Sequence, residues 1–304
     1  MMRFIKQPDL ILETNYHPIY VFTSKENDHN IDYNVVQAFG EEWSKFNSFS
    51  DKEIEKLGDS YFDILDEEII NKSSCMIDFG AGSARFSKYL SDKVKFIDVL
   101  EPSNAVFAAS NLLRDVNNVR ITKASIGSAP YEDGAYDFGM SIGVLHHIPD
   151  TQSGLAQCIK KIKPDGWFYV YFYYNLDNKG FLFKTLFGIV NLFRIAISRL
   201  PFGIKNIACD FMAIILYMPI ILLGRIFNFF GFKNFAKKFP LNYYQNQSFR
   251  IIRNDALDRF GTRLEKRFSK VEIEEMMKAC GLSNIRISSQ EPYWHAVGQK
   301  TTSP

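Results

Sequence analysis

One segment, Met76–Ser87, constrains the fold of this chain more than any other. It reads MIDFGAGSARFS: an apolar run ends at Asp78, two glycines follow at Gly80 and Gly82, and a helix-like stretch begins. The first glycine permits a tight turn, and the second lets a ligand approach the main chain closely. The amino terminus of the helix would present unpaired amides to an anionic group. The segment therefore predicts a strand–loop–helix unit that binds a nucleotide-like ligand.

Residues 73–175 continue this alternation of apolar runs and helix-like stretches. The runs are short and rich in Val, Ile, Phe or Tyr: CMIDF, KFIDVLE, VRITKAS, AYDFGMSIG and GWFYVYFYY. Several lack polar alternation, which is typical of parallel strands covered on both faces. Near the end of the chain, a capping box at Ser269–Glu272 predicts a helix, and residues 284–288 and 294–299 predict two closing strands. Together these elements predict a doubly wound α/β sheet.

Two positions narrow the choice of ligand. Glu101 closes the run FIDVL, 23 residues after Asp78, where an acidic side chain can accept both hydroxyls of a ribose. A nicotinamide-binding loop carries a third glycine where this chain has Phe86, so that class of ligand is disfavoured. The alternative for Glu101 is that it only caps the next helix. Asp98, in the middle of the same run, is expected to lie on an exposed edge of the sheet.

Four segments, in order and spacing, resemble the successive motifs of class I S-adenosylmethionine (SAM)-dependent methyltransferases: MIDFGAGSARFS, FIDVLEPS, YDFGMSIGVLHHIPD and IKKIKPDGWFYVY. The resemblance covers about residues 38–175 and 268–300. It implies a Rossmann-like, doubly wound sheet of seven strands with the last strand antiparallel. It also implies an enzyme whose cofactor, SAM, lies across the carboxyl ends of the first two strands.

The resemblance assigns cofactor-binding roles to positions of this chain. The methionine moiety falls to Asp78, Gly80 and Gly82, and the ribose to Glu101, with Pro102 turning the chain out of the strand. The wall beside the sulfonium falls to the stretch that contains Ser141 and Gly143.

Two further cofactor positions depart from the pattern or leave a choice open. Many relatives carry an acidic residue after the third strand, to accept from the adenine amino group. Here that strand ends in Lys123-Ala-Ser-Ile, so Ser125 or a backbone group must serve. Trp43 resembles an aromatic residue that many relatives place over the cofactor, and the alternative is a core anchor beside Phe39.

Candidates for the chemistry follow the fourth predicted strand. Methyl transfer needs an in-line approach with water excluded, and a base only when the nucleophile starts as a hydroxyl or an acidic carbon. His146 and His147 lie where such a base is expected. The alternative is that one histidine packs under the sheet and the other binds the backbone. Asp150 either orients an imidazole or starts the next helix.

Candidates for binding the acceptor lie near the carboxyl end of the chain. Arg263 and Arg267 would grip an anionic group such as a phosphate, unless they only decorate a solvated loop. Trp294 is expected near the strand ends, lining the acceptor site.

Residues 176–240 break the strand–helix pattern. They are dense in Phe, Ile and Leu, and they carry nine basic against two acidic residues, a local net charge of +7. Phe181–Leu200 has a single polar stripe, the pattern of an interfacial membrane helix. The apolar stretch Phe211–Gly224 is shorter than the roughly 20 residues that span a bilayer, and Pro219 is expected to kink it. Two alternatives remain: residues 181–238 lie on an anionic membrane, or they form a lid or a homodimer surface.

Composition excludes some classes of protein. Hydrophobic residues make up 46% and charged residues 23%, as in ordinary globular proteins, and the net charge of +2 gives no sign of a nucleic-acid partner. The four cysteines form no CxxC pair, so no metal site is predicted. The first residues lack the apolar core of a signal peptide. We expect a cytoplasmic protein, peripheral to the inner face of the membrane if the insertion binds lipid.

The predicted organisation has four regions: N-terminal preamble and helices over 1–72, a SAM-binding core over 73–175, an apolar, basic helical insertion over 176–265, and a C-terminal helix with closing strands over 266–304. The predicted reaction moves a methyl group from SAM to an oxygen, or second to a carbon, of a small molecule, lipid or lipid-linked glycan. The alternatives are a non-catalytic SAM-fold scaffold protein and a nicotinamide-dependent oxidoreductase.

Overall fold

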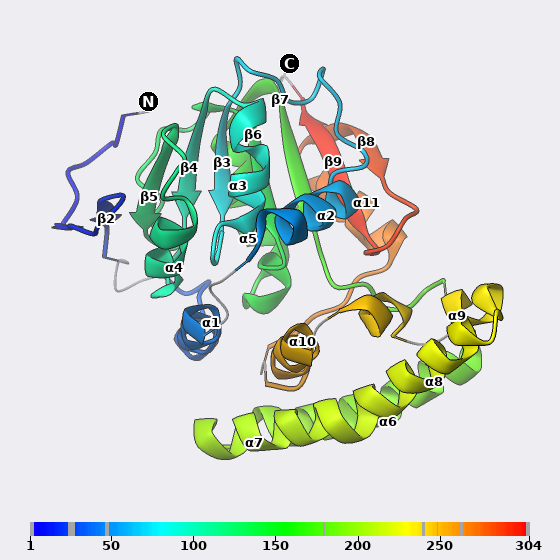
Figure 1. Ribbon diagram of the computed structural model, residues 1–304. Helices are drawn as coiled ribbons and strands as arrows, with labels where there is room; N and C mark the ends of the chain where they lie inside the picture. The colour runs from blue at the N-terminus through cyan, green and yellow to red at the C-terminus, as the bar shows by residue number, and fades with distance from the viewer. Residues whose placement is uncertain are drawn as a thin grey trace. The chain divides into compact units, whose positions relative to one another are not determined.

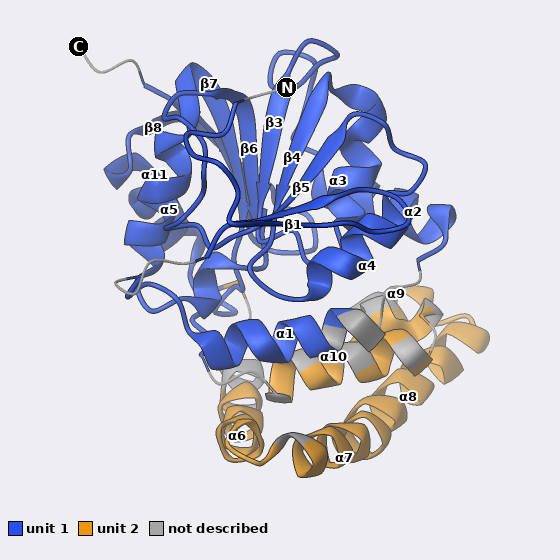
Figure 2. Cartoon of the chain, turned by 90° about the vertical axis from the view of Figure 1, so that its left-hand side faces the viewer, with its two compact units in different colours: residues 1–177, 264–304 blue, residues 178–263 orange. Residues whose placement is uncertain are grey.

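The computed structural model describes residues 3–23, 28–45, 49–178, 180–238, 241–247, 249–261 and 264–301 (Figure 1). The chain divides into two compact units, coloured separately in Figure 2. Unit 1 comprises Met1–Asp177 and Leu264–Pro304, and unit 2 comprises Asn178–Arg263. Unit 2 is therefore an insertion between two segments of unit 1.

Unit 1 is built on a nine-stranded sheet of order β1-β2-β5-β4-β3-β6-β7-β9-β8. The strands from β2 to β7 pair in parallel, whereas β9 runs antiparallel to both of its neighbours. The strands are β1 Leu10–Leu12, β2 Ile19–Val21, β3 Cys75–Phe79, β4 Phe96–Leu100, β5 Val119–Lys123, β6 Tyr136–Ile142, β7 Ile162–Tyr171, β8 Leu282–Ile287 and β9 His295–Lys300. The predicted doubly wound sheet with an antiparallel strand near its end is confirmed.

The predicted count of seven strands is wrong by two. The first 50 residues add β1 and β2 beside β5, with β2 parallel to β5 and β1 antiparallel to β2. Each of these strands has three residues, and β1 is mostly exposed. Such short strands carry too few positions to show a period of two, so the sequence pattern could not reveal them.

Helices cover both faces of this sheet (Figure 1). Apolar side chains of α2, α3 and α4 join one core cluster with Met76, Ile97 and Val99, whereas those of α5 and α11 join the opposite cluster with Ile77 and Phe79. Alternate residues of β3 and β4 thus face opposite layers, which explains their unbroken apolar runs. The helices of unit 1 are α1 Tyr33–Lys45, α2 Asp51–Tyr61, α3 Arg85–Leu90, α4 Ala105–Leu112, α5 Thr151–Lys160 and α11 Lys270–Ala279.

The expectation that Asp98 lies on an exposed edge is wrong. β4 is an interior strand, and Asp98 is fully buried. Its carboxylate accepts from Arg120 on β5, with Nε–Oδ1 at 2.6 Å and Nη2–Oδ2 at 3.0 Å, and from the Tyr136 hydroxyl at 2.7 Å. Arg120 also lies 3.9 Å from the centre of the Phe4 ring, so the N-terminal segment covers this part of the sheet.

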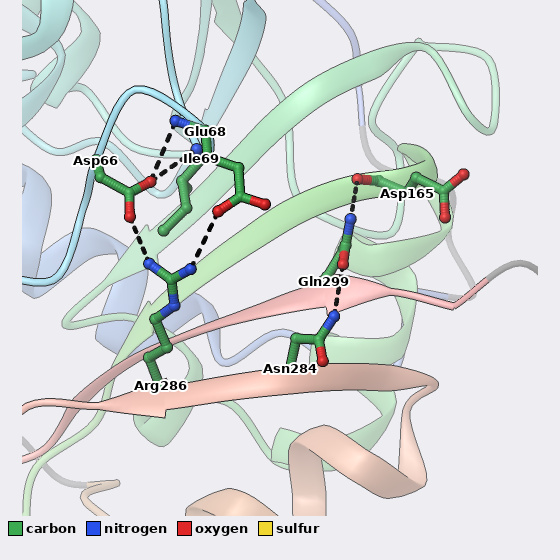
Figure 3. Close-up of polar contacts among 7 residues, drawn as sticks. All are labelled: Asp66, Glu68, Ile69, Asp165, Asn284, Arg286 and Gln299. Atoms are coloured by element: carbon green, nitrogen blue, oxygen red, sulfur yellow. Dashed lines mark hydrogen bonds and ion pairs between the residues drawn. The ribbon is translucent and has the colours of Figure 1, made fainter.

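Exposed polar contacts tie the closing strands to other parts of unit 1 (Figure 3). Arg286 on β8 contacts Asp66 at 2.6 Å and Glu68 at 3.3 Å, both in the loop after α2. Gln299 on β9 donates to the Asp165 carbonyl at 3.0 Å. The predicted capping box is present, because Ser269 accepts from the Glu272 amide and the Glu272 carboxylate accepts from the Ser269 amide.

Unit 2 is helical: α6 Phe181–Ser198, α7 Phe202–Met212, a π turn over Ala213–Tyr217, α8 Met218–Phe229, α9 Lys233–Lys238, a 3₁₀ turn over Asn242–Asn246 and α10 Phe249–Gly261. Its own core joins Cys209, Ala213, Tyr217 and Ile221 to apolar residues of α10 and the 3₁₀ turn.

The expected short apolar stretch is part of a much longer helix. Gly203–Phe229 is continuous over 27 residues, and by length and composition alone it could cross a membrane. Pro219 lies in the first turn of α8, directly after the π turn, where its missing amide is tolerated and the helix continues. The uncharged stretch Phe211–Gly224 is therefore the middle part of this longer helix.

Candidate active site

The glycine loop has the backbone that its residues predict. Gly80 and Gly82 both adopt positive φ, at +74° and +56°. A Cβ at Gly80 would lie 2.5 Å from the Val144 side chain, and one at Gly82 would lie 3.1 Å from the indole nitrogen of Trp43. Only glycine satisfies both the conformation and the close approach at Gly80.

Glu101 links the end of β4 to this loop. Its buried carboxylate accepts from the Gly82 amide at 2.9 Å through Oε2 and from the Ser103 amide at 2.9 Å through Oε1. Ser103 itself accepts from the Ala105 amide at 3.0 Å and so begins α4. Glu101 is therefore more than a helix cap, because one of its oxygens is directed at the glycine loop.

Asp78 adds a second buried carboxylate at the end of β3. It accepts from the Ser87 hydroxyl at 2.7 Å. Burial raises the pKa of Asp78 to about 7; the Ser87 hydrogen bond opposes this rise and the negative charge of Glu101 adds to it. Two acids enclosed together favour a cationic ligand group, which would stabilise both charges.

The stretch after β6 forms the neighbouring wall. Ser141 is fully buried and donates to the Phe79 carbonyl at 3.2 Å, which joins β6 to β3. Gly143 has φ +76°, although a Cβ there would meet nothing within 4 Å, so its conformation rather than space requires glycine. Pro102, half-buried, follows Glu101 directly.

In the structure, an acidic residue lies next to Ser125, and the sequence pattern did not predict this contact. The Ser125 hydroxyl donates to Asp28 at 2.5 Å and shares a contact of 2.6 Å with Ser128. A Cβ at Gly127 would lie 2.8 Å from the Asp28 carboxylate. Asp28 belongs to the N-terminal segment, which Asn30 ties to the Asp150 backbone at 2.7 and 2.9 Å. No local pattern signals a contact between positions 97 residues apart.

Helix α1 runs from this segment toward the glycine loop. Gly40 lies against Ser103, where a Cβ would be 3.1 Å from the Ser103 Cβ. Further along, the Arg85 guanidinium lies 4.3 Å from the centre of the Trp43 ring. Trp43 is half-buried and contacts the loop rather than filling the sheet core. Trp43 therefore packs beside the glycine loop, and its role as a cover for the cofactor stays a prediction.

The two histidines differ in their surroundings. Both lie in the 3₁₀ turn Leu145–His147 directly after β6, and both are buried. His147 Nδ1 contacts the Leu264 carbonyl at 2.7 Å, and its ring packs against Phe39. Neither ring nitrogen of His146 has a hydrogen-bond partner among the described residues.

Burial, His147 and Arg267, in that order, keep the pKa of His146 well below its usual value. Its ring is therefore neutral near pH 7 and retains one nitrogen able to accept a proton. Asp150 accepts from the Ser153 amide at 3.0 Å, so it starts α5.

The predicted acceptor-binding residues have internal partners. Arg267 binds Glu265 Oε1 through Nε at 2.8 Å and Nη2 at 2.7 Å, and donates to the Tyr174 carbonyl at 3.2 Å. Trp294 is buried and donates to Asp177 at 2.9 Å. Arg263 lies outside the described residues. The structure thus brings Arg267 and Trp294 to the chain that follows β7.

A group of half-buried tyrosines at the carboxyl end of β7 was not singled out from the sequence. Tyr171 meets Tyr61 of α2 edge-on at 5.2 Å and Tyr173 at 6.1 Å between ring centres. Tyr173 lies 4.1 Å from His146. The run YFYY was the available signal, because a strand end alternates its side chains between faces. We call Tyr61, Tyr171 and Tyr173 the tyrosine cluster.

Comparisons with known proteins find similarity to methyltransferases. A family model described as a methyltransferase domain matches residues 77–170. A relative, the ubiquinone biosynthesis O-methyltransferase of Marinobacter nauticus, is 22% identical over 169 residues, which cover 53% of this chain and 70% of that protein.

Solved structures extend the comparison to the fold. Human N-acetylserotonin methyltransferase in complex with SAM aligns over 87% of this chain and 57% of its own, with 13% identity and a TM-score of 0.50. A SAM-dependent methyltransferase of Thermotoga maritima aligns over 89% of this chain and 100% of its own, with 14% identity and a TM-score of 0.47.

Residues 77–170 of the chain are therefore a methyltransferase domain, and the chain has the fold of the SAM-dependent methyltransferases. It is an enzyme, and its cofactor is SAM.

Proposed function

We propose that this methyltransferase methylates a hydroxyl oxygen of a lipid-type acceptor, with carbon as the second choice of atom. The proposal rests on the position of His146. Its buried, neutral imidazole lies beside the tyrosine cluster, at the carboxyl ends of β6 and β7. A hydroxyl nucleophile must lose a proton during methylation, and His146 is the group suited to receive it.

The residues around the glycine loop fit SAM. Asp78 is suited to the cationic amino group, the amides near Gly80 and Gly82 to the carboxylate, and Glu101 to the ribose hydroxyls. We assign the adenine to Ser125, with Asp28 as the carboxylate that accepts from its amino group. When bound, SAM supplies an electrophilic methyl group.

The chain's own residues would then position the acceptor and manage its proton. The tyrosine cluster offers ring faces and hydroxyls at the end of β7, which suit a partly apolar acceptor. Trp43, on α1, would cover the reacting groups and exclude water. Trp294 and Arg267 would support the wall of the acceptor site, because each already has partners within unit 1.

The choice of a lipid-type acceptor has two supports. The Marinobacter relative is named for O-methylation in ubiquinone biosynthesis. Unit 2 exposes many large apolar side chains, which suit contact with lipid. A small soluble molecule and a lipid-linked glycan remain the alternative acceptors. The location proposed with this acceptor is cytoplasmic and peripheral to the inner face of the membrane; a homodimer through residues 181–238 is the alternative use of unit 2.

Two measurements test the proposal. Calorimetry should show binding of SAM to the full chain, and a Glu101→Ala variant should bind it at least about tenfold more weakly, since a charged hydrogen-bond acceptor is lost. Incubation with isotopically labelled methyl-SAM and separated lipid and water-soluble extracts should then place label in a lipid fraction. Label in the soluble fraction alone would reject the lipid-type acceptor. SAM binding with label in neither fraction would favour the non-catalytic scaffold.

A further inference from the structure

The long helix of unit 2 has two different faces. Cys209, Ala213, Tyr217 and Ile221 recur every four residues and are buried against the unit's own core. The opposite face exposes a stripe of large apolar side chains with 46–72% of their surface accessible; its members are Ile204, Ile207, Phe211, Ile214, Leu222 and Ile226. We call these six residues the apolar stripe. A helix surrounded by lipid on all sides would not need two such faces.

The connectivity of the chain excludes a single membrane crossing by this helix. β7 precedes unit 2 and β9 follows it, and the two strands are hydrogen-bonded neighbours in one sheet. Both ends of unit 2 must therefore lie on the same side of any bilayer. In the part of the chain that the structure describes, Gly203–Phe229 is the one helix with the length and composition to span.

A second crossing by α6 would carry polar groups into the hydrocarbon. Arg194 lies in that helix and donates to Asn191 at 2.7 Å. On the long helix, Asp210 accepts two bonds from Arg253 of α10, at 2.7 and 2.6 Å. Because α10 packs on the buried face of the long helix, that ion pair would enter the bilayer with it. An arrangement flat on the surface keeps these groups at the water-facing side.

Charge identifies the kind of membrane. Unit 2 contains 13 Lys and Arg against 3 Asp, a net charge of +10, whereas the whole chain carries +2. Arg199 and Lys233, beyond the two ends of the long helix, are both exposed. Basic residues that flank an apolar helical face are attracted to anionic headgroups.

We infer that unit 2 binds one leaflet of an anionic bilayer, with helix Gly203–Phe229 parallel to the surface and its apolar stripe inserted. The inference also implies that this leaflet supplies the lipid-type acceptor, and this one point rests on the proposed function. The membrane association itself depends only on unit 2.

Vesicle flotation of the full chain tests the inference. The wild-type protein should float with vesicles containing phosphatidylglycerol, float less with pure phosphatidylcholine vesicles, and be released as salt rises. The double variant Ile207→Asp, Phe211→Asp should bind at least about tenfold more weakly. Both side chains are exposed, so circular dichroism should not change. A matched control, Val271→Asp on the exposed surface of α11, should bind as the wild type does. No flotation with either lipid, or equal loss in the control, would overturn the inference.

Labelling of the helix ends separates a flat helix from a spanning one. Gly203→Cys and Asn228→Cys place thiols at two exposed positions. Both should react equally with a membrane-impermeant maleimide added outside sealed vesicles. If one end reacts only after the vesicles are lysed, the helix spans and the inference is wrong. Sedimentation in the absence of lipid tests whether the apolar stripe instead binds a second copy of the chain. If the wild-type protein does not float but forms a stable dimer, and the Ile207→Asp, Phe211→Asp variant abolishes that dimer, the stripe is a dimer surface and the inference is wrong.

The SAM titration keeps the two proposals separate. A protein that floats but does not bind SAM would reject the proposed function and retain the membrane-binding unit. A protein that binds SAM but does not float would reject only the membrane-binding unit.

Discussion

The two units of this chain differ in how much of their large apolar side chains they bury and in the sign of their net charge. Unit 1 buries its apolar runs between a sheet and two helical layers and carries a net charge of −8. Unit 2 carries +10, and it holds 17 of the 24 large apolar side chains that are exposed among the described residues. Exposure on this scale is unusual for a globular surface. If unit 2 attaches the chain to a surface as inferred, this attachment is separable from the cofactor chemistry of unit 1, and substitutions in either unit test the separation.

The largest expected effect is confined to unit 1. Asp98→Ala leaves Arg120 buried without its partner and should lower the free energy of unfolding of unit 1 by about 3–5 kcal/mol. The double variant Asp98→Leu, Arg120→Met removes both charges and should recover much of that loss. Denaturant unfolding followed by hydrogen exchange in each unit measures this. Equal loss of protection in unit 2 would mean that the two units unfold together.

Asp78→Asn should separate the stability of unit 1 from its cofactor binding. Burial raises the pKa of Asp78 from its ordinary value of 3.8 to about 7 in the folded protein, so the folded protein loses stability as the pH rises from about 4 to about 7. The variant removes this loss and should gain up to about 4 kcal/mol at pH 8, while its affinity for SAM falls. Thermal unfolding and SAM titration at pH 5 and pH 8 provide the comparison. A gain at pH 5 as large as that at pH 8 would contradict the assigned pKa.

His146→Gln tests the chemistry without disturbing unit 2. It should lower kcat by at least about 10²-fold, about 3 kcal/mol, with SAM affinity and vesicle flotation unchanged. Because the pKa of His146 is well below 6.5, wild-type kcat should not fall from its protonation until the pH is well below 6.5. His147→Gln should have the smaller effect, since His147 is bound to the Leu264 carbonyl. A larger effect of His147→Gln would reverse the assignment of the base.

Gly224→Val probes whether unit 2 has a core of its own. A Cβ at Gly224 would lie 2.2 Å from the buried side-chain amide of Gln245, so the larger side chain must displace it. Overpacking of this kind should destabilise unit 2 by about 2 kcal/mol. Hydrogen exchange should report the loss in unit 2, whereas SAM affinity should be retained. A drop in SAM affinity matching the loss of stability would show that the units are coupled.

The smallest expected effect is Ser269→Ala, which removes the cap of α11. The Ser269 hydroxyl accepts from the Glu272 amide at 3.2 Å, and its loss should cost about 1 kcal/mol of unit 1 stability. Ser269→Asp, which can still cap, serves as the control in the same thermal melts. An unchanged melting temperature in the alanine variant would mean that water replaces the cap without cost.

The sequence predicted what local pattern determines. Apolar runs predicted the core strands that the structure contains, and the glycine loop with Glu101 predicted which end of the sheet binds the ligand. Contacts between residues far apart in the sequence could not be predicted in this way. No local sequence pattern indicates that Ser125 binds Asp28, or that Asp98 pairs with Arg120 on the neighbouring strand. The length of the helix that contains Pro219 was also not predicted, because Asp210 and Arg225 interrupt the apolar run at both ends.

The antiparallel strand β9 has a consequence for the order in which the protein is made. Tyr171 of β7 pairs with His295 of β9, and all of unit 2 lies between them in the chain. A ribosome therefore releases the apolar stripe before the last strands of the sheet have been synthesised. If unit 2 binds a membrane as inferred, the nascent chain can attach to it while the catalytic sheet is still incomplete.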